Sequence, residues 1–339
     1  MNEKMIDDEV FIIGEKSIKR GQSLYFDLNI GRLYDFTELS LPICVIRGKK
    51  PGPVFFISGA VHGDEIIGPE IIKRLLLNKK LKINSGTLVC IPIVNVFGFN
   101  SKSRYLPDRR DLNRCFPGSD KGSLSSRLAN IFLNEVILKC HYGIDLHSAA
   151  VHRSNLPQIR ACLDNKFTEE LAFKFGAPVI INSKIRDGSL REAAEGNGLP
   201  ILVFEGGEAL RHDESVIRVA QKGILNCLNH LGMIHLPSEM KIKKQAFLAK
   251  SSYWVRASQS GVVRSKKSLG DFVESNTKLC HISDAFSKNK SIVKAKREGV
   301  IIGENRLPLV NQGDALYHIA TFAENDLDQM PDDLPDYVD

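Results

Sequence analysis

The spacing of hydrophobic residues changes twice along the chain and divides it into three parts. Between residues 10 and 48, short apolar stretches alternate with polar positions and glycine-containing turns, which predicts β-strands. From residue 52, continuous apolar runs alternate with segments whose apolar residues recur at helical spacing. After about residue 240 the helical spacing disappears, and short strand-like segments follow as far as residue 322.

The central part predicts an α/β domain. Continuous apolar runs are typical of strands that helices cover on both faces, and strands that alternate with helices indicate a mostly parallel sheet. Ser123 and Ser189 precede two of the helical segments and are expected to be their N-caps. The expected strands are 54–59, 87–94, 142–147, 178–181 and 201–204, and the expected helices are 69–79, 123–139, 166–175, 189–196 and 213–231.

We therefore expect a mixed, mostly parallel sheet flanked by helices over residues 1–240. The strands of residues 10–48 belong either to this sheet or to a separate lobe. Residues 241–325 are expected to form a small all-β domain of the sandwich or barrel type, which resembles biotinyl and lipoyl carrier domains. Its turn at 274–276 lacks the lysine that such carriers modify. Residues 326–339 are expected to be an acidic tail.

Composition and charge argue against several classes of function. The formal charge of +6 is spread over 339 residues without a basic stripe, so we expect no nucleic-acid partner. The seven cysteines are single and odd in number, which indicates a reducing compartment. No apolar run approaches the about 18 residues of a membrane span, and residues 1–10 lack the apolar core of a signal peptide. We expect a cytoplasmic protein without a membrane partner. Formation of a homo-oligomer is compatible with the sequence.

Two separate stretches place histidines where strands end. In GAVHGDEIIGPE, residues 59–70, His62 and Glu65 lie on the loop between a predicted strand and a predicted helix. Such loops at the carboxyl ends of parallel strands bind ligands. In YGIDLHSA, His147 ends another strand, and Asp145 lies on the same side of that strand. Two imidazoles and a carboxylate are a ligand set of catalytic zinc sites, and Asp145 is a candidate to orient an imidazole. Taken alone, His62 and Glu65 are more typical of a solvated loop, and His147 is more typical of a hydrogen-bonded histidine at a strand end.

Charged residues also gather in SRYLPDRRDLNRCFPG, residues 103–118, and at the end of the apolar run in ILVFEGGE. A guanidinium group pairs with a carboxylate through two hydrogen bonds, so the arginines of 103–118 are candidate substrate contacts, although we expect Arg109 and Arg110 to belong to a solvated loop. Glu205 closes the apolar run, where a carboxylate can serve as a general acid or base. Three more arginines are candidate carboxylate contacts, but we expect them at the surface: Arg160, Arg186 and Arg191.

Taken in order, H-G-D-E, D-L-N-R, D-L-H-S and a glutamate that ends a late strand resemble the succinylglutamate desuccinylase/aspartoacylase family over about residues 50–235. The resemblance implies the zinc carboxypeptidase fold, with one zinc ion per chain held by His62, Glu65 and His147. The C-terminal β domain also has a counterpart in this family.

The resemblance further implies roles for the remaining residues. Asn113 and Arg114 would bind a substrate carboxylate, Glu205 would be the catalytic acid and base, and Arg104 would lie near the scissile carbonyl. The expected activity is zinc-dependent hydrolysis of the amide bond of an N-acyl amino acid or a related small amide, with a small carboxylate-bearing substrate. A carboxypeptidase acting on short peptides and a non-catalytic ligand-binding relative remain alternatives. The β domain would either cover the active-site mouth or form an oligomer interface.

Overall fold

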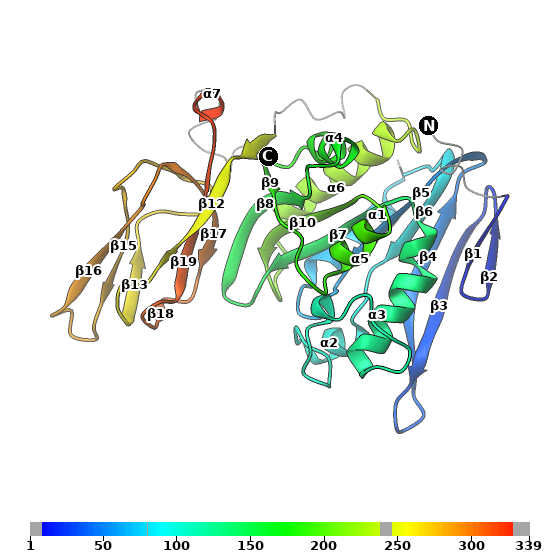
Figure 1. The fold of residues 1–339 in the computed structure, drawn as a ribbon, viewed down its shortest axis with the longest axis horizontal. Coiled ribbons are helices and arrows are strands. Elements are labelled where there is room, and N and C mark those ends of the chain that lie inside the picture. Colours follow the sequence, from blue (N-terminus) through cyan, green and yellow to red (C-terminus); the bar gives the residue numbers. More distant parts are fainter. Residues whose placement is uncertain (1–8, 80, 238–245, 328–339) are drawn as a thin grey trace.

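A single long sheet forms the centre of the computed structural model, which describes residues 9–79, 81–237 and 246–327 (Figure 1). In hydrogen-bonded order its strands are β12 (Ser251–Arg256), β19 (Ala315–Thr321), β17 (Gly299–Asn305), β8 (Arg153–Ala161), β10 (Ile201–Glu208), β7 (Tyr142–Ala149), β5 (Lys50–Gly59), β6 (Ser85–Ile91), β4 (Glu38–Arg47) and β3 (Ser23–Arg32). Off this path are β9 (Val179–Asn182), which pairs with β8 and β11 (Phe247–Ala249), and β14 (Phe272–Val273), which pairs with β17.

The middle of the sheet is parallel and its margins are antiparallel. β10, β7, β5 and β6 run parallel to one another, whereas β8 and β4 run antiparallel to β10 and β6. This mixed order confirms the fold class expected from the sequence. Because β3 and β4 extend the main sheet, most of the N-terminal strand region belongs to it. Only β1 (Val10–Ile13) and β2 (Lys16–Lys19) form a separate two-stranded sheet.

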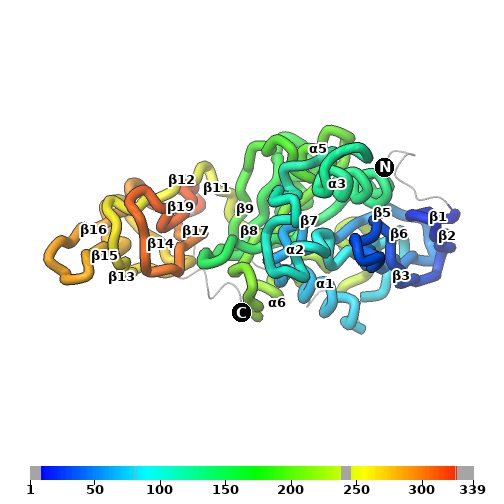
Figure 2. The backbone as a smooth tube through the Cα atoms, turned by 90° about the horizontal axis from the view of Figure 1, so that it is seen from below, coloured from blue at the N-terminus to red at the C-terminus, as the bar shows by residue number. Residues whose placement is uncertain are grey.

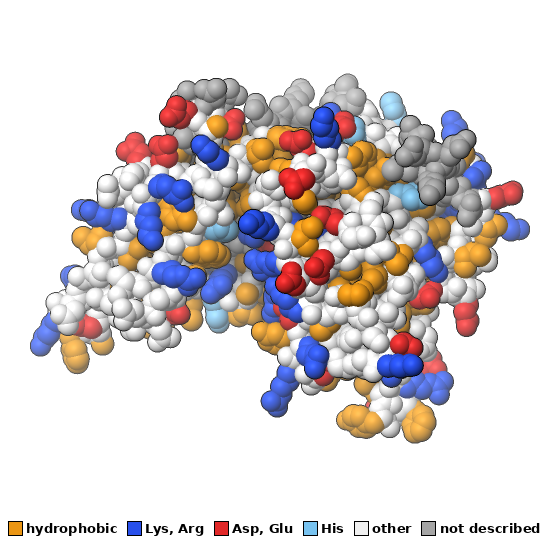
Figure 3. Space-filling model, viewed as in Figure 1, with side chains coloured by type: hydrophobic (Ala, Val, Ile, Leu, Met, Phe, Trp, Pro, Cys, Tyr) orange, Lys and Arg blue, Asp and Glu red, His pale blue; other side chains and the backbone are white. Residues whose placement is uncertain are grey.

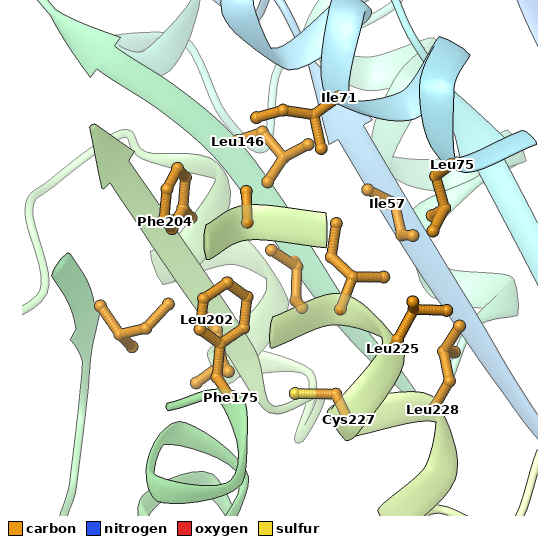
Figure 4. Close-up of a cluster of buried hydrophobic side chains, with 14 of the residues drawn as sticks. Ile57, Ile71, Leu75, Leu146, Phe175, Leu202, Phe204, Leu225, Cys227 and Leu228 are labelled. Atoms are coloured by element: carbon orange, nitrogen blue, oxygen red, sulfur yellow. The ribbon is translucent and has the colours of Figure 1, made fainter. Parts of the chain in front are cut away.

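Helices cover both faces of the sheet, and each layer closes over its own apolar core. One core lies under α1 (Ile67–Leu77), α4 (Lys166–Phe175) and α6 (Glu214–His230). Figure 4 shows Phe175 of α4 beside Leu202 of β10, and Leu75 of α1 beside Ile57 of β5. The other core lies under α2 (Val96–Ser101), α3 (Leu124–Glu135) and α5 (Leu190–Gly196). Each fully buried Leu, Ile or Phe contributes about 1.5–3 kcal/mol, so these cores hold the loops between the layers in place.

Several element ends differ from the sequence prediction. Ser123 and Ser189 cap α3 and α5 as expected. The predicted helix 123–139 is too long, because the backbone leaves the helical region at Val136 and continues as the 3-10 turn η3 (Ile137–Lys139). The predicted strand 87–94 is wrong at its end, since β6 stops before Pro92, whose ring cannot donate a ladder hydrogen bond.

The C-terminal β region (residues 246–322) stands at one end of the molecule (Figure 2). A four-stranded antiparallel sheet packs there against β12, β17 and β19 around a third apolar core. Its strands are β16 (Lys290–Lys294), β15 (Lys278–Ser283), β13 (Gly261–Ser265) and β18 (Leu309–Val310). β17 also pairs with β8, with Gly303 opposite Asn155, so this region continues the main sheet.

Parts of the predicted domain division lie outside the described residues. The predicted boundary at 240 falls in 238–245, and most of the expected acidic tail falls in 328–339. The described chain ends with the short helix α7 (Glu324–Leu327). All seven cysteines carry free thiols, as the sequence predicts.

The core under α3 gives a test of the packing. Phe132 is fully buried in α3, so Phe132→Ala is expected to lower the free energy of unfolding by about 3–5 kcal/mol, because a cavity remains where the ring was. Phe173→Ala is the matched control, since Phe173 is 40% exposed on α4 and should cost much less. Urea denaturation followed by circular dichroism measures both. Equal losses would contradict the assignment of Phe132 to the core.

Candidate metal centre and cavity

The loop after β5 is held close to α2 and carries the first two candidate ligands. At Gly63 an added Cβ would lie 2.0 Å from the carbonyl carbon of Gly98, so only glycine fits this close approach of two backbones. β7 lies beside β5 in parallel register, with Gly59 opposite Leu146. His147 therefore lies in β7 one residue beyond this pair, next to the loop that begins after Gly59.

His62, Glu65 and His147 converge at this point, and all three are buried. Glu65 Oε1 lies 2.7 Å from His62 Nδ1, and Glu65 Oε2 lies 2.7 Å from His147 Nδ1. The two Nδ1 atoms are 3.2 Å apart. One ligand atom from each residue lies within 4.8 Å of the others, which is the donor set of a three-ligand zinc site.

Carboxylates outside this group hold the far side of each imidazole. Asp145 Oδ2 lies 2.7 Å from His147 Nε2, and the hydroxyl of Ser58 donates a hydrogen bond to Asp145 Oδ1 at 2.7 Å. Asp111 Oδ1 lies 3.2 Å from His62 Nε2. With Nε2 of each ring committed to a carboxylate, both Nδ1 atoms face the candidate metal position. Asp145 is the residue that the sequence offers as the one to orient an imidazole, whereas the sequence assigned no role to Asp111.

The electrostatics of the group favour positive charge at its centre. Burial acts to lower the pKa of His147, but Asp145 and Glu65 outweigh it and raise this pKa well above its usual range. Burial acts to raise the pKa of Glu65, yet the two imidazoles lower it well below its usual range. A buried carboxylate that stays ionised between two imidazoles requires neighbouring positive charge, and a divalent cation also meets that requirement.

Arg104 lies against the same group. Its Nη2 donates to Asp111 Oδ2 at 2.9 Å, and its Nη1 donates to Glu65 Oε1 at 3.3 Å. Asp111 thus joins Arg104 to His62, and the guanidinium group is fixed beside the candidate metal ligands. The side chain remains 26% exposed, so it can still reach a bound molecule.

A cavity of about 500 Å³ opens from the three candidate ligands and takes in every catalytic and substrate-binding residue predicted from the sequence. Glu205 lies in its wall within β10, which continues past the strand end expected at residue 204, and its Oε2 accepts a hydrogen bond of 2.9 Å from Asn155. Asn113 and Arg114 come from the 3-10 turn η2 (Leu112–Arg114). The Asn113 Oδ1 atom accepts the backbone N–H of Leu190 at 2.9 Å, which ties this turn to α5.

Further cations in the cavity wall were not expected there. Arg160, Arg186 and Arg191 all line the cavity. The prediction that they lie at the surface is wrong for Arg191, which is buried, and for Arg160, which is half-buried, whereas Arg186 is exposed at the cavity. The wall also contains Lys184 and Arg153. Desolvation first, and then repulsion by Arg114 and Arg160, lower the pKa of Arg186. In Figure 3, Lys and Arg side chains gather around the hollow between the C-terminal β region and the helical part.

The C-terminal β region supplies one side of the cavity. Trp254 of β12 and Glu304 of β17 are among the lining residues. Trp254 stacks on His318, with ring centroids 4.4 Å apart and an interplanar angle of 6°, and Arg153 lies 5.8 Å from the Trp254 ring centroid. Of the two roles that the sequence left open for this region, the structure thus favours a wall beside the candidate site.

Comparison with known proteins agrees with this arrangement. A family model described as the succinylglutamate desuccinylase/aspartoacylase catalytic domain matches residues 51–231, more than half of the chain. The chain belongs to the succinylglutamate desuccinylase/aspartoacylase family. All the predicted site residues of this family member lie inside the matched segment.

Relatives cover nearly the whole length of this family member. The N-alpha-acetyl-L-2,4-diaminobutyric acid deacetylase of Halomonas elongata is 26% identical over 298 residues, 84% of this chain and 86% of the relative. The crystal structure of a succinylglutamate desuccinylase/aspartoacylase from Rhodobacter sphaeroides has a TM-score of 0.76 at 24% identity and covers 89% of this chain and 96% of its own. The product-bound structure of the ectoine utilization protein EutE (DoeB) from Ruegeria pomeroyi has a TM-score of 0.79 at 23% identity. It covers 94% of this chain and 100% of its own.

The described helices also bear on membrane insertion. None of the helices in residues 9–79, 81–237 and 246–327 combines the length and apolar composition needed to cross a membrane.

Metal binding tests the three-residue group directly. His147→Ala is expected to abolish tight zinc binding, and Asp145→Asn is expected to weaken it by about 10- to 100-fold, because the imidazole loses the group that orients it. Competition with a chromophoric chelator measures the dissociation constant. His212→Ala is the control, since His212 is exposed and does not line the cavity, and it should bind zinc as the unaltered protein does. Undiminished binding by His147→Ala would place the metal elsewhere.

Proposed function

We propose that this chain is a zinc-dependent hydrolase that cleaves the amide bond of an N-acyl amino acid or a related small amide. The observation that carries the proposal is the meeting of the three candidate ligands with Glu205 in one cavity. Membership of the family and the deacetylase activity named for the Halomonas relative support hydrolysis of an amide bond. The products would be a carboxylic acid and a free amino acid.

The donor set fits a zinc ion held by His62, Glu65 and His147. Two imidazole nitrogens and a carboxylate leave a fourth position open, as in catalytic zinc sites. When bound there, zinc would act as a Lewis acid and lower the pKa of water at the site towards about 7. Asp145 and Asp111 would hold the two rings with Nδ1 directed at the ion.

Glu205 is proposed to move the proton. Glu205 lies within β10, opposite His147 in the parallel pairing with β7 and just before the register of the two strands shifts. The amide of Asn155 holds one oxygen by a hydrogen bond, and the other lies 3.9 Å from Arg160 Nε. This oxygen would take the proton of the attacking water and then deliver it to the nitrogen of the departing amine. Arg104 would donate hydrogen bonds to the amide oxygen as negative charge develops on it.

The cations of the cavity are proposed to bind substrate carboxylates. Asn113 and Arg114 would bind one substrate carboxylate, because both side chains line the cavity and the turn η2 that contains them is hydrogen-bonded to α5. Arg160 and Arg186 face the same space, and their mutual repulsion would fall when an anion lies between them. This excess of positive charge supports a substrate with more than one carboxylate. The wall formed by Trp254 supports a small substrate over an extended peptide.

The proton-transfer role predicts a loss of turnover without loss of metal. Glu205→Gln is expected to lower kcat by about 10²- to 10⁴-fold, because the amide cannot accept the proton, while zinc stays bound. Glu208→Gln is the matched control on the same strand, since Glu208 accepts the backbone N–H of His152 and does not line the cavity. A panel of N-acyl amino acids and short peptides, assayed by amine release, measures the change. Turnover of Glu205→Gln at the unaltered rate would contradict the assignment.

The cation cluster predicts a preference that depends on substrate charge. Arg186→Ala is expected to raise KM roughly 10- to 100-fold for substrates with two carboxylates, as loss of a charged hydrogen bond does, and to change KM little for matched substrates with one. Arg109→Ala is the control, because Arg109 is exposed and does not line the cavity. Equal effects on both substrate types would show that Arg186 does not bind the second carboxylate.

A further inference from the structure

Asn155 of β8 lies where the C-terminal β region joins the strands that carry the candidate site (Figure 2). It is opposite Gly207 of β10 on one side and opposite Gly303 of β17 on the other. Its Nδ2 donates a hydrogen bond of 2.9 Å to Glu205 Oε2, and its side chain lines the cavity. Asn155 thus contacts the proposed proton-transfer group and belongs to the strand on which β17 docks.

An irregularity in the pairing of β8 with β10 turns Asn155 towards Glu205. Glu205 lies opposite Gln158. The next pair joins Gly207 to Asn155, so β10 advances two residues while β8 advances three. The extra residue lies in the segment of β8 that contains Pro157, whose nitrogen cannot donate a ladder hydrogen bond. Because strand side chains alternate between faces, this bulge brings Asn155 to the face of Glu205, whereas regular pairing would turn it to the opposite face.

Glycine on both neighbouring strands leaves room for the Asn155 amide. Gly207 has no side chain opposite it, and its φ of 73° lies in the left-handed region that glycine enters without strain. At Gly303 an added Cβ would lie 3.0 Å from Asn155 Oδ1 and 3.2 Å from the Cβ of His318. Both distances are shorter than the best separation of non-bonded atoms, which is about 3.5–4.0 Å between carbons. A side chain at Gly303 would therefore press on the amide from the C-terminal β region.

The hydrogen bond from Asn155 sets the direction of the Glu205 carboxylate. The Glu205 side chain is 21% exposed, and within the part of the chain that the structure describes, Asn155 alone donates a hydrogen bond to it. Because a carboxylate is planar, holding Oε2 also fixes where Oε1 points. Displacement of a reacting group by about 1 Å lowers a rate by as much as about 100-fold. The amide is therefore placed to affect turnover through Glu205.

We infer that Asn155 is a positioning residue for Glu205, and that the pairing of β17 with β8 holds Asn155 in place. The inference rests on the proposed function, since it requires Glu205 to move the proton. It gives the C-terminal β region a part in turnover beyond that of a cavity wall. β17 carries Gly303, whose missing side chain leaves the amide free to reach the carboxylate. Asn155 exchanges no proton itself and acts only through Glu205.

Removal of the amide tests the positioning role. Asn155→Ala is expected to lower kcat about 10- to 100-fold, as loss of a hydrogen bond to a charged group does, while KM and zinc affinity stay nearly unchanged. Asn155→Asp keeps the shape of the side chain but replaces the donor with a second carboxylate, and it should lower kcat at least as far at neutral pH. Initial rates of amine release from the best N-acyl amino acid of the panel give kcat and KM.

Controls separate this role from packing and from the proposed function. Ser154→Ala should leave kcat unchanged, since Ser154 precedes Asn155 in β8 and does not line the cavity. A rise in KM without a fall in kcat would make Asn155 a substrate contact and overturn the inference. Loss of activity in Glu205→Gln with full activity in Asn155→Ala also overturns it, but leaves the proposed function standing. Full activity in both variants overturns the role of Glu205 and the inference together.

The second test concerns the contribution of β17. Gly303→Ala is expected to lower kcat, because the new Cβ would crowd Oδ1 of Asn155 and move the amide away from Glu205. In the Asn155→Ala background the same change should lower kcat little further, since the crowded amide is absent and the two effects are coupled. Equal losses in both backgrounds overturn the part assigned to β17. Because the new Cβ also approaches His318, circular dichroism checks that the variant folds, and the Asn155 variants test the positioning role without this contact.

Discussion

The candidate site depends on the parallel pairing of β5 with β7. This pairing places residues separated by more than 80 positions at one edge of the sheet, and the register puts His147 beside the loop that carries His62 and Glu65. Slippage of one residue would turn His147 to the opposite face of the sheet, because strand side chains alternate. The apolar cores on both faces oppose such slippage, so the packing of the helices also fixes the distances among the three ligands.

Three carboxylates around the candidate metal position, Glu65, Asp145 and Asp111, are tolerated there because each has partners. Glu65 lies between two imidazoles and also accepts the backbone N–H of Ser148 at 3.2 Å. Asp145 is satisfied by Ser58 and His147, and Asp111 is satisfied by His62 and Arg104. A buried charge without such contacts would cost several kcal/mol. Asp145 and Asp111 thus have two effects: they stabilise the fold, and they orient the imidazole rings of His147 and His62.

The sequence predicted those parts of the structure that depend on local pattern. Apolar runs next to H-G-D-E and D-L-H-S located two strands of the parallel sheet, and polar side chains near the carboxyl ends of such strands share one edge. The end of the second strand was placed too early, because β7 continues to Ala149. β8 was missed, because polar residues and Pro157 interrupt its sequence, although it lies centrally between β10, β17 and β9. The contact of Asp111 with His62 was missed for a different reason. It joins side chains 49 positions apart, and nothing in D-L-N-R shows which way the aspartate points.

The cavity wall was the least predictable part. Trp254 lies in the wall because three strand pairings place β12 there: β17 pairs with β8, β19 pairs with β17, and β12 pairs with β19. No local sequence pattern encodes these pairings. The same applies to Arg160 and Arg186, whose surroundings come from distant elements.

Anomalous diffraction from zinc-soaked crystals, recorded on both sides of the zinc absorption edge, shows whether His62, Glu65 and His147 together hold one ion. We expect a single strong peak about 2.0–2.2 Å from Nδ1 of His62, a Glu65 oxygen and Nδ1 of His147. A protein that turns over substrate with no peak at these atoms, or with its peak at other residues, would contradict it.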